Sequence, residues 1–223
     1  MPQPSTPITS RSNNNPTSVR TKAVWASLAG GMVVVTGLLL AMDPGASFGR
    51  GGMNLPALAA AAGSTSLETI FQTRQPEAAW QSIVIHHAAA PYATAESLDE
   101  SHRRQGLTGL GHHFIVGNNN GLGDGEIHAG YRWLDQLPGA HAAGEHGDWY
   151  NRNAIGIVLV GNGDRRGFTD QQMARLVDLV SALSRRYGIP PESVVLHSDI
   201  APTTSPGRFF PAAAFREALD SQR

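Results

Sequence analysis

The chain has 223 residues, of which 41% are hydrophobic, so it is long enough for one domain of ordinary size with a sizeable core. It contains no cysteine, which excludes a disulfide framework and any cysteine-ligated zinc site and leaves His, Asp and Glu as the strong metal ligands. The net charge of −1 and the lack of a run of Lys and Arg argue against nucleic acid as a partner.

The N-terminal part divides into three segments of different composition. Residues 1–22 are polar and rich in Pro, Ser, Thr and Asn, which predicts a disordered cytoplasmic tail. Residues 23–42 carry no charge, and as a helix at about 1.5 Å per residue they would span roughly 30 Å, the thickness of a bilayer core. Residues 43–75 are rich in Gly, Ala and Ser and are interpreted as a linker.

The residues that flank segment 23–42 indicate its orientation. Lys22 precedes it and Asp43 follows it, so the bias of basic residues toward the cytoplasm places the remainder of the chain outside. We therefore expect an extracytoplasmic domain attached to the membrane by a transmembrane anchor. The alternative is a signal segment whose cleavage gives a secreted or periplasmic protein, although the apolar core of such a segment is usually about 7–15 residues long.

The folded domain is expected to occupy residues 76–223. Short apolar runs bounded by turn residues predict strands at 83–85, 114–116, 126–128, 154–162 and 193–197. Helical periodicity with capping residues predicts helices at 93–106, 169–188 and 212–221. The order β-α-β-β-β-α-β-α favours an α/β fold of the α+β type, a central mixed β-sheet flanked by helices, with the strongly apolar strand 154–162 in its centre.

Two histidines stand at the ends of predicted strands. His86 directly follows 83–85, and His197 ends 193–197. Strand ends in an α/β sheet are where sites are commonly built, because side chains converge at an open edge. A single histidine in such a place is more often a satisfied polar residue. Two of them, the second followed by the rigid loop HSDIAPTTSPGRFFP, favour a functional site.

Five motifs occur in a fixed order along the domain: IVIHHAAAP, GLGHHFIVGNNNGLGDGEIHAGYRW, GAHAAG, NAIGIVLVGN and HSDIAPTTSPGRF. In this order they resemble zinc-dependent N-acetylmuramoyl-L-alanine amidases, the group that includes a phage lysozyme-amidase and the animal peptidoglycan-recognition proteins. The resemblance covers about residues 78–220. It implies a zinc-bearing groove on one face of a mixed sheet, peptidoglycan or muropeptides as partner, and hydrolysis of the amide bond between N-acetylmuramic acid and L-alanine.

The resemblance also implies roles for individual residues. His86 and His197 match two ligands of a Zn²⁺ cofactor, and Ser205 occupies the third ligand position, where the family usually has cysteine or aspartate. His112 stands where many members have a tyrosine that is thought to assist the chemistry. Thr203 stands where members often have Lys or Thr. The implied metal ligands are thus His86, His197 and Ser205, and the implied catalytic residues are His112 and Thr203.

The departure at Ser205 leaves two main functions open. Two imidazoles with a thiolate or carboxylate leave a Zn²⁺ site of charge +1, whereas a neutral hydroxyl leaves +2 and is a weaker ligand. Retention of His86 and His197 favours a zinc amidase that acts on cell-wall peptidoglycan. Ser205 and His112 favour a non-catalytic peptidoglycan- or muropeptide-binding domain on the same fold. A hydrolase with another substrate or metal arrangement is a third alternative, and the sequence does not determine the oligomeric state.

The remaining histidines of these motifs are expected to have structural roles. His87 and His113 alternate with the site positions along their strands and are expected to face the other side of the sheet. His141, in the motif GAH, is interpreted as a residue of the groove wall. His102 and His146 are expected to be packing or surface residues.

Two charged residues near the motifs are also interpreted. Asp199 lies two residues after His197, and a structural role in fixing the loop is favoured over metal ligation. Arg132 is left between two roles. One is an interaction with a stem-peptide carboxylate, and the other is packing at the end of a hairpin.

Overall fold

A computed structural model of the chain describes residues 66–222. The sheet strands are β1 (Ser82–His87), β2 (Phe114–Val116), β3 (Ile127–Ala129), β4 (Ala154–Leu159) and β5 (Val194–Leu196). The longer helices are α4 (Ala95–Arg104), α7 (Asp170–Tyr187) and α9 (Ala212–Ser221). Short helical segments are α3 (Leu67–Ile70), α5 (Tyr131–Leu134), α6 (Gly147–Asn153), η1 (Pro191–Ser193) and α8 (His197–Ile200).

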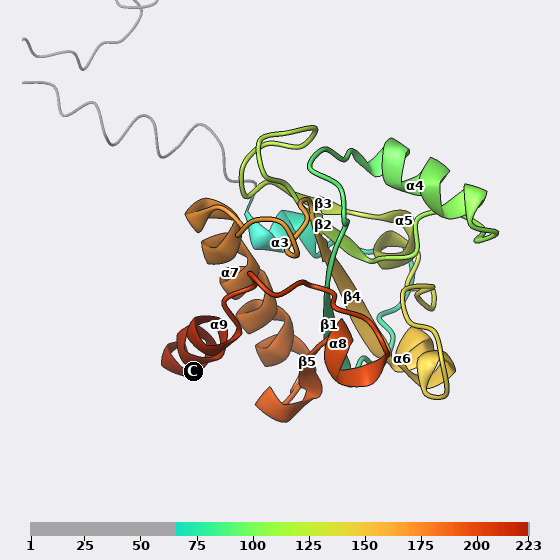
Figure 1. Cartoon of the computed structure of the whole chain (residues 1–223). Helices are drawn as coiled ribbons and strands as arrows, with labels where there is room; N and C mark the ends of the chain where they lie inside the picture. Colours follow the sequence, from blue (N-terminus) through green and yellow to red (C-terminus); the bar gives the residue numbers. More distant parts are fainter. Residues whose placement is uncertain (1–65, 223) are drawn as a thin grey trace, which may run out of the picture. The chain divides into compact units, whose positions relative to one another are not determined.

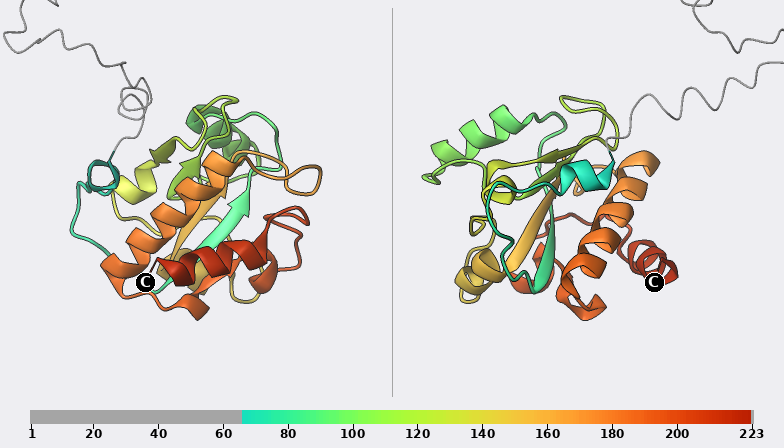
Figure 2. Two further views of the ribbon diagram at one scale, coloured as in Figure 1. Left: turned by 90° about the vertical axis from the view of Figure 1, so that its left-hand side faces the viewer. Right: turned by 180° about the vertical axis from the view of Figure 1, so that it is seen from behind.

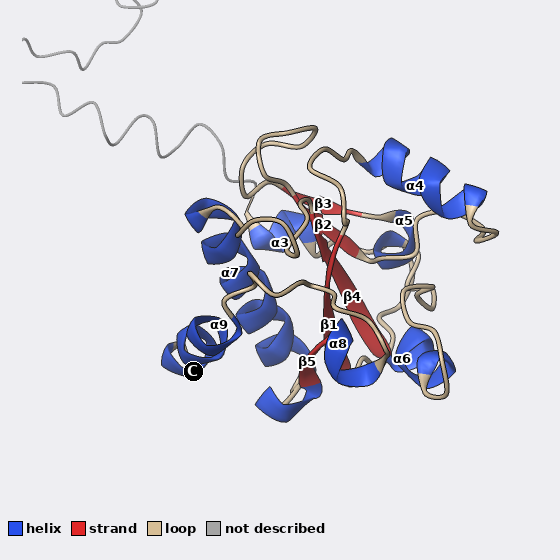
Figure 3. Cartoon of the chain, in the orientation of Figure 1, coloured by secondary structure: helices blue, strands red, loops and turns tan. Residues whose placement is uncertain are grey.

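The five strands form one mixed sheet in the order β3-β2-β4-β1-β5 (Figures 1 and 3). β2 and β3 are antiparallel, and the other neighbouring pairs are parallel. The predicted mixed sheet with flanking helices is therefore confirmed. β4 is the central strand, as its apolar sequence predicts, and all six of its residues are buried.

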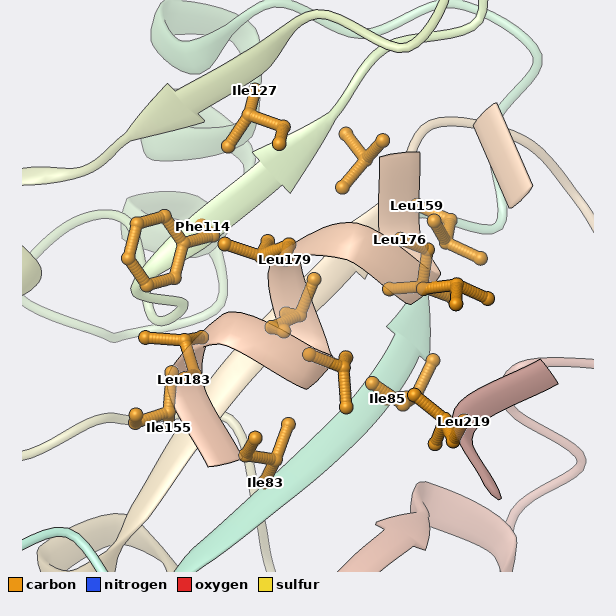
Figure 4. Packing of buried hydrophobic residues seen from close by; sticks show 14 of the residues in the cluster. Ile83, Ile85, Phe114, Ile127, Ile155, Leu159, Leu176, Leu179, Leu183 and Leu219 are labelled. Atoms are coloured by element: carbon orange, nitrogen blue, oxygen red, sulfur yellow. The ribbon is translucent and has the colours of Figure 1, made fainter. Parts of the chain in front are cut away.

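The main core lies between the sheet and helices α7 and α9. β1 turns Ile83 and Ile85 toward this side, where they meet Leu179 and Leu183 of α7 (Figure 4). Helix α7 has its apolar residues on one face, so it can cover the sheet while its charged residues stay in water. Figure 2 shows α7 and α9 together on this side of the strands.

The opposite face of the sheet has a smaller core under α4. Leu98 of α4 packs in a cluster with Ile115 of β2 and Val158 of β4. Residues in register on neighbouring strands point to the same face, and His86 of β1 pairs with Val158. His86 therefore lies on the α4 face and not in the main core.

Capping residues set the helix ends that the sequence predicts. The side chain of Thr169 accepts a hydrogen bond from the backbone N–H of Gln172, and Gly188 ends α7 in the left-handed conformation. Thr94 and Ser97 form a capping box at the start of α4. Helix α4 therefore covers residues 95–104 within the predicted 93–106.

Several one-turn elements were not predicted, because a single turn has no measurable periodicity. His197 is the first residue of α8 and follows β5, so the predicted strand end at 197 is one residue too long. The apolar strand 154–162 ends at Leu159, three residues earlier than predicted. Ile70 and Phe71, in the segment interpreted as a linker, are buried in the main core.

The predicted tail 1–22, the membrane segment 23–42 and most of the linker 43–75 lie outside the described residues. Among residues 66–222, no helix has the length and apolar character needed to cross a membrane.

Candidate active site

The sheet brings His86 and His197 together at the carboxyl ends of two neighbouring parallel strands. Ile85 of β1 pairs with Leu196 of β5, and the next residue in the chain after each of them is a histidine. The ring centroids of His86 and His197 are 4.3 Å apart. His86 is buried and His197 is half-buried. The Nε2 atom of His197 is buried and has no hydrogen-bond partner among residues 66–222. The two imidazoles predicted as metal ligands are therefore neighbours in space.

Ser205 lies beside this pair, on the loop that follows α8. Its Oγ atom accepts a hydrogen bond of 3.1 Å from the backbone N–H of His87, the residue after His86. Its own carbonyl accepts a bond of 2.8 Å from the backbone N–H of Ser198, the residue after His197. Ser205 is buried and is thus joined to both histidine-bearing segments.

Thr203 lies two residues before Ser205 and is exposed. Its Oγ1 atom accepts a hydrogen bond of 3.2 Å from the backbone N–H of Ser205, so it supports the turn that carries the serine. The hydroxyl hydrogen of Thr203 is not used in that bond. Thr203 therefore stands at the solvent side of the site, while Ser205 lies inside it.

His112 approaches from the segment that precedes β2. Its ring centroid is 4.7 Å from that of His86, and its buried Nδ1 atom has no hydrogen-bond partner in the described part of the chain. We expected His102 of α4 to be a packing or surface residue. Its ring centroid lies 5.4 Å from that of His112. The Nδ1 atom of His102 accepts a hydrogen bond of 3.0 Å from the backbone N–H of Gly111. His102 thus supports the segment that carries His112.

His141 is closer to the site than the sequence indicated. It was interpreted as a wall residue, yet its Nδ1 atom lies 3.2 Å from Nε2 of His86 in a buried hydrogen bond. Its Nε2 atom lies 3.3 Å from the carbonyl oxygen of Ala154. The motif GAH, which contains His141, carries no local signal of a bond to a residue 55 positions away.

Burial keeps these imidazoles uncharged near neutral pH. Removal from water lowers the pKa of His86 and His112 well below the usual 6.5, and neighbouring imidazoles lower it further. Burial likewise lowers the pKa of His141 to about 3, and it lowers the pKa of His197. Neutral imidazoles keep one lone pair each, which is the form that binds metals and accepts protons.

The donor set can be compared with what zinc requires. A catalytic zinc site usually has three protein ligands drawn from His, Asp, Glu and Cys. Within residues 66–222, no three such side chains are arranged to hold a metal ion. His86 and His197 supply two imidazoles, and the third neighbour is the neutral hydroxyl of Ser205. The donors that meet here are thus two imidazoles and one neutral hydroxyl, one strong ligand fewer than a catalytic zinc site usually has.

The loop 161–167 holds the loop that carries Ser205 in place. One carboxylate oxygen of Asp164 accepts a hydrogen bond of 2.7 Å from the hydroxyl of Thr204, and the other accepts one of 3.3 Å from the backbone N–H of Arg208. A side chain at Gly163 would overlap the carbonyl oxygen of Pro206, so the two loops can pack this closely only with glycine there. Asp164 therefore joins the loop 161–167 to the loop that carries Ser205.

The neighbouring histidines His87 and His113 bond to backbone groups. The Nδ1 atom of His87 accepts a hydrogen bond from the backbone N–H of Gly163. His113 has both ring nitrogens in contacts with backbone groups of Gly156 and Leu137. These contacts suit the structural roles expected for His87 and His113.

Asp199 and Arg132 form hydrogen bonds with backbone groups and so have structural roles. Asp199 accepts a hydrogen bond of 2.9 Å from the backbone N–H of Leu196, at the start of α8. Arg132 is buried and donates to the carbonyl oxygens of Leu110 and Pro138. Of the two roles left open for Arg132, the structure supports packing, because burial removes the guanidinium from a carboxylate in solvent.

Comparison with known proteins identifies the family. The profile of the family described as N-acetylmuramoyl-L-alanine amidase matches residues 76–208. The chain belongs to this family. The match covers both histidine-bearing segments, the segment before β2 and the turn with Ser205. The chain is therefore an amidase enzyme, as the order of its motifs predicted.

Individual relatives agree with this assignment. The endolysin of Enterobacteria phage T3 is 33% identical over 142 residues, which cover 59% of this amidase and 83% of the relative. A peptidoglycan-recognition protein of Drosophila simulans is 30% identical over 136 residues, which cover 56% of this amidase and 68% of the relative. The solved structure of the endolysin N-acetylmuramoyl-L-alanine amidase LysCS from Clostridium intestinale URNW has a TM-score of 0.55 and 29% identity, and covers 67% of this amidase and 91% of that chain.

Proposed function

We propose that this amidase uses zinc to hydrolyse the amide bond between N-acetylmuramic acid and L-alanine in peptidoglycan. The observation that carries the proposal is the convergence of His86 and His197, with 4.3 Å between ring centroids, beside the buried hydroxyl of Ser205. Membership of the N-acetylmuramoyl-L-alanine amidase family supports the bond that is cleaved. Zinc would be held by His86 and His197, with Ser205 as the third and weakest ligand.

When bound there, zinc would supply Lewis-acid polarisation of the scissile carbonyl and a more acidic water. The remaining chemistry belongs to the chain. Amide hydrolysis requires a base that takes a proton from the attacking water and an acid that delivers a proton to the leaving nitrogen as the C–N bond breaks. A single neutral imidazole can do both in turn.

His112 is the residue we assign to this proton transfer. It is buried beside His86, burial lowers its pKa, and its Nδ1 atom has no hydrogen-bond partner within the described residues. Thr203 stands at the solvent side with its hydroxyl hydrogen free of the bond to Ser205, so it can donate to a substrate oxygen. His112 is thus assigned to proton transfer and Thr203 to hydrogen bonding of the same amide.

The first experiment measures zinc content and amidase activity in the same preparations. We expect the parent protein to bind about one zinc and to release stem peptides from purified peptidoglycan. His86→Ala and His197→Ala should abolish both, because a lone imidazole beside a hydroxyl does not retain the metal. His146→Ala, in an exposed loop, is the matched control and should behave as the parent.

The competing function is a peptidoglycan-binding module without catalysis, and the observation in its favour is the neutral Ser205 in the third ligand position. The same preparations distinguish the two. A protein that sediments with insoluble peptidoglycan, holds no zinc when zinc is in excess, and releases no stem peptide would support the binding module and contradict the zinc amidase.

Location follows from the substrate. Cell-wall peptidoglycan lies outside the cytoplasm, so we propose an extracytoplasmic domain over residues 76–223. Attachment through residues 23–42 remains our prediction from their uncharged, bilayer-length sequence.

A further inference from the structure

His141 forms a chain of two hydrogen bonds that ends on the backbone of the central strand. Its Nδ1 atom contacts Nε2 of His86 at 3.2 Å, and its Nε2 atom contacts the carbonyl oxygen of Ala154 at 3.3 Å. Both bonds are buried. Ala154 begins β4 beside β1, so these two hydrogen bonds connect His86 to the central strand of the sheet.

The positions of the protons follow from the carbonyl. A carbonyl oxygen only accepts, so Nε2 of His141 must carry the hydrogen. A neutral imidazole has one N–H, so Nδ1 of His141 accepts, and Nε2 of His86 must be the donor. The single remaining lone pair of His86 is then on Nδ1. Charging either ring would be costly here, because both are buried among other imidazoles.

The ring of His141 lies in a space that the fold leaves open for it. A side chain at Gly139 or at Gly156 of β4 would overlap its Cδ2 atom. Its backbone N–H donates to Oδ1 of Asn151 at 2.9 Å, and Asn151 also bonds to the backbone of Ala142. Gly139, Gly156 and the hydrogen bonds of Asn151 to the backbone therefore determine where this ring lies, independently of His86.

We propose that His141 is the positioning residue of His86: it holds His86 as the Nε2–H tautomer and so directs the Nδ1 lone pair to the ligand site. The part of this inference that concerns zinc rests on the proposed function. A histidine ligand usually needs a partner for its other nitrogen, which fixes the tautomer and ring orientation. In this chain the partner is a second imidazole, itself held by a main-chain carbonyl.

The test combines a spectroscopic readout without metal and a binding readout with metal. In the metal-free parent, long-range proton–nitrogen NMR spectra should assign His86 as the Nε2–H tautomer and His141 likewise. In His141→Ala, His86 should become a mixture of tautomers. Zinc affinity, measured by competition with a chromophoric chelator, should fall by about 10- to 100-fold, the usual effect of losing such a partner.

Two further variants distinguish positioning from general damage. His141→Gln keeps a side-chain oxygen that can accept from Nε2 of His86 and should recover much of the affinity. Gly156→Ala keeps His141 but displaces its ring, so it should mimic His141→Ala. His146→Ala, from the same loop region but exposed, should match the parent.

The outcomes separate this inference from the proposed function. An Nδ1–H tautomer for His86 in the parent would overturn the inference whether or not zinc binds. This measurement uses only the parent protein, so it does not depend on the folding of any variant. Unchanged zinc affinity in folded His141→Ala would overturn it as well. If the parent shows the expected tautomer but binds no zinc, the proposed function fails and the positioning of His86 by His141 stands.

Discussion

The hydroxyl of Ser205 accepts a hydrogen bond of 3.1 Å from the backbone N–H of His87, one residue from the proposed ligand His86. The bond holds the side chain of residue 205 against the end of β1. A metal-binding atom of another side chain at this position would lie beside the same N–H group. In the proposed zinc site, the chemistry of residue 205 would therefore limit how strongly this position binds the metal.

We accordingly predict that Ser205→Cys binds zinc at least about tenfold more tightly than the parent, since even a supporting contact to a ligand is worth about 10- to 100-fold. A thiolate adds a soft anionic donor, and the N–H of His87 would stabilise its charge. Amidase activity on peptidoglycan should rise in parallel. Zinc affinities of parent, Ser205→Cys and Ser205→Ala, measured at one pH, check this. Equal affinity of the cysteine variant and the parent would show that residue 205 does not face the metal.

The second prediction concerns the link between the Ser205 loop and the loop 161–167. Asp164→Ala removes the acceptors for the hydroxyl of Thr204 and the N–H of Arg208, so the segment 201–210 should open more often. Hydrogen exchange followed by mass spectrometry should show faster exchange there, while α7 remains unchanged as the internal control. Asp164→Asn retains one carbonyl acceptor and should give an intermediate rate. Unaltered exchange in 201–210 would show that Asp164 does not hold the loop.

The third prediction is a loss of stability in mild acid. Burial lowers the pKa of His113 from 6.5 to about 4. The unfolded chain therefore binds this proton more readily than the folded protein. The stabilisation is fully present above pH 6.5 and is lost as the pH falls from 6.5 toward 4. The shift corresponds to about 3 kcal/mol at pH 4.

Urea denaturation between about pH 7 and about pH 4.5, followed by tryptophan fluorescence, measures this loss. His113→Asn removes the titrating group and keeps an oxygen that can accept from the N–H of Gly156, so its stability should fall less steeply over the same range. The exposed His146→Asn should retain the slope of the parent. A parent that is equally stable at both ends of this range would contradict the prediction.

The fourth prediction concerns attachment to the membrane. If residues 23–42 are an uncleaved anchor, the protein should remain in the membrane fraction after a high-salt wash and its N-terminal sequence should begin before residue 23. The same protein should be accessible to protease from outside the cytoplasm. A mature N-terminus near residue 60 would instead show cleavage and contradict the anchor.

The sequence alone was sufficient for the parts of this protein that depend on local pattern. The apolar run of β4, the capped amphipathic helix α7 and the order of strands and helices follow from periodicity and turn residues, which act over a few neighbouring positions. His86 and His197 could be singled out because each stands at a strand end within an ordered motif. One-turn helices and exact strand ends were not predicted, because so few residues show no hydrophobic periodicity.

The tertiary structure decided the relationships between residues distant in the chain. The bond between His86 and His141 joins positions 55 apart, and that between Ser205 and His87 joins positions 118 apart. Nothing near His141 in the sequence distinguishes a wall residue from a partner of His86. Hydrogen bonds are directional and depend on distances of about 3 Å, so only the packed sheet and its loops determine which imidazole meets which, and therefore where the protons lie.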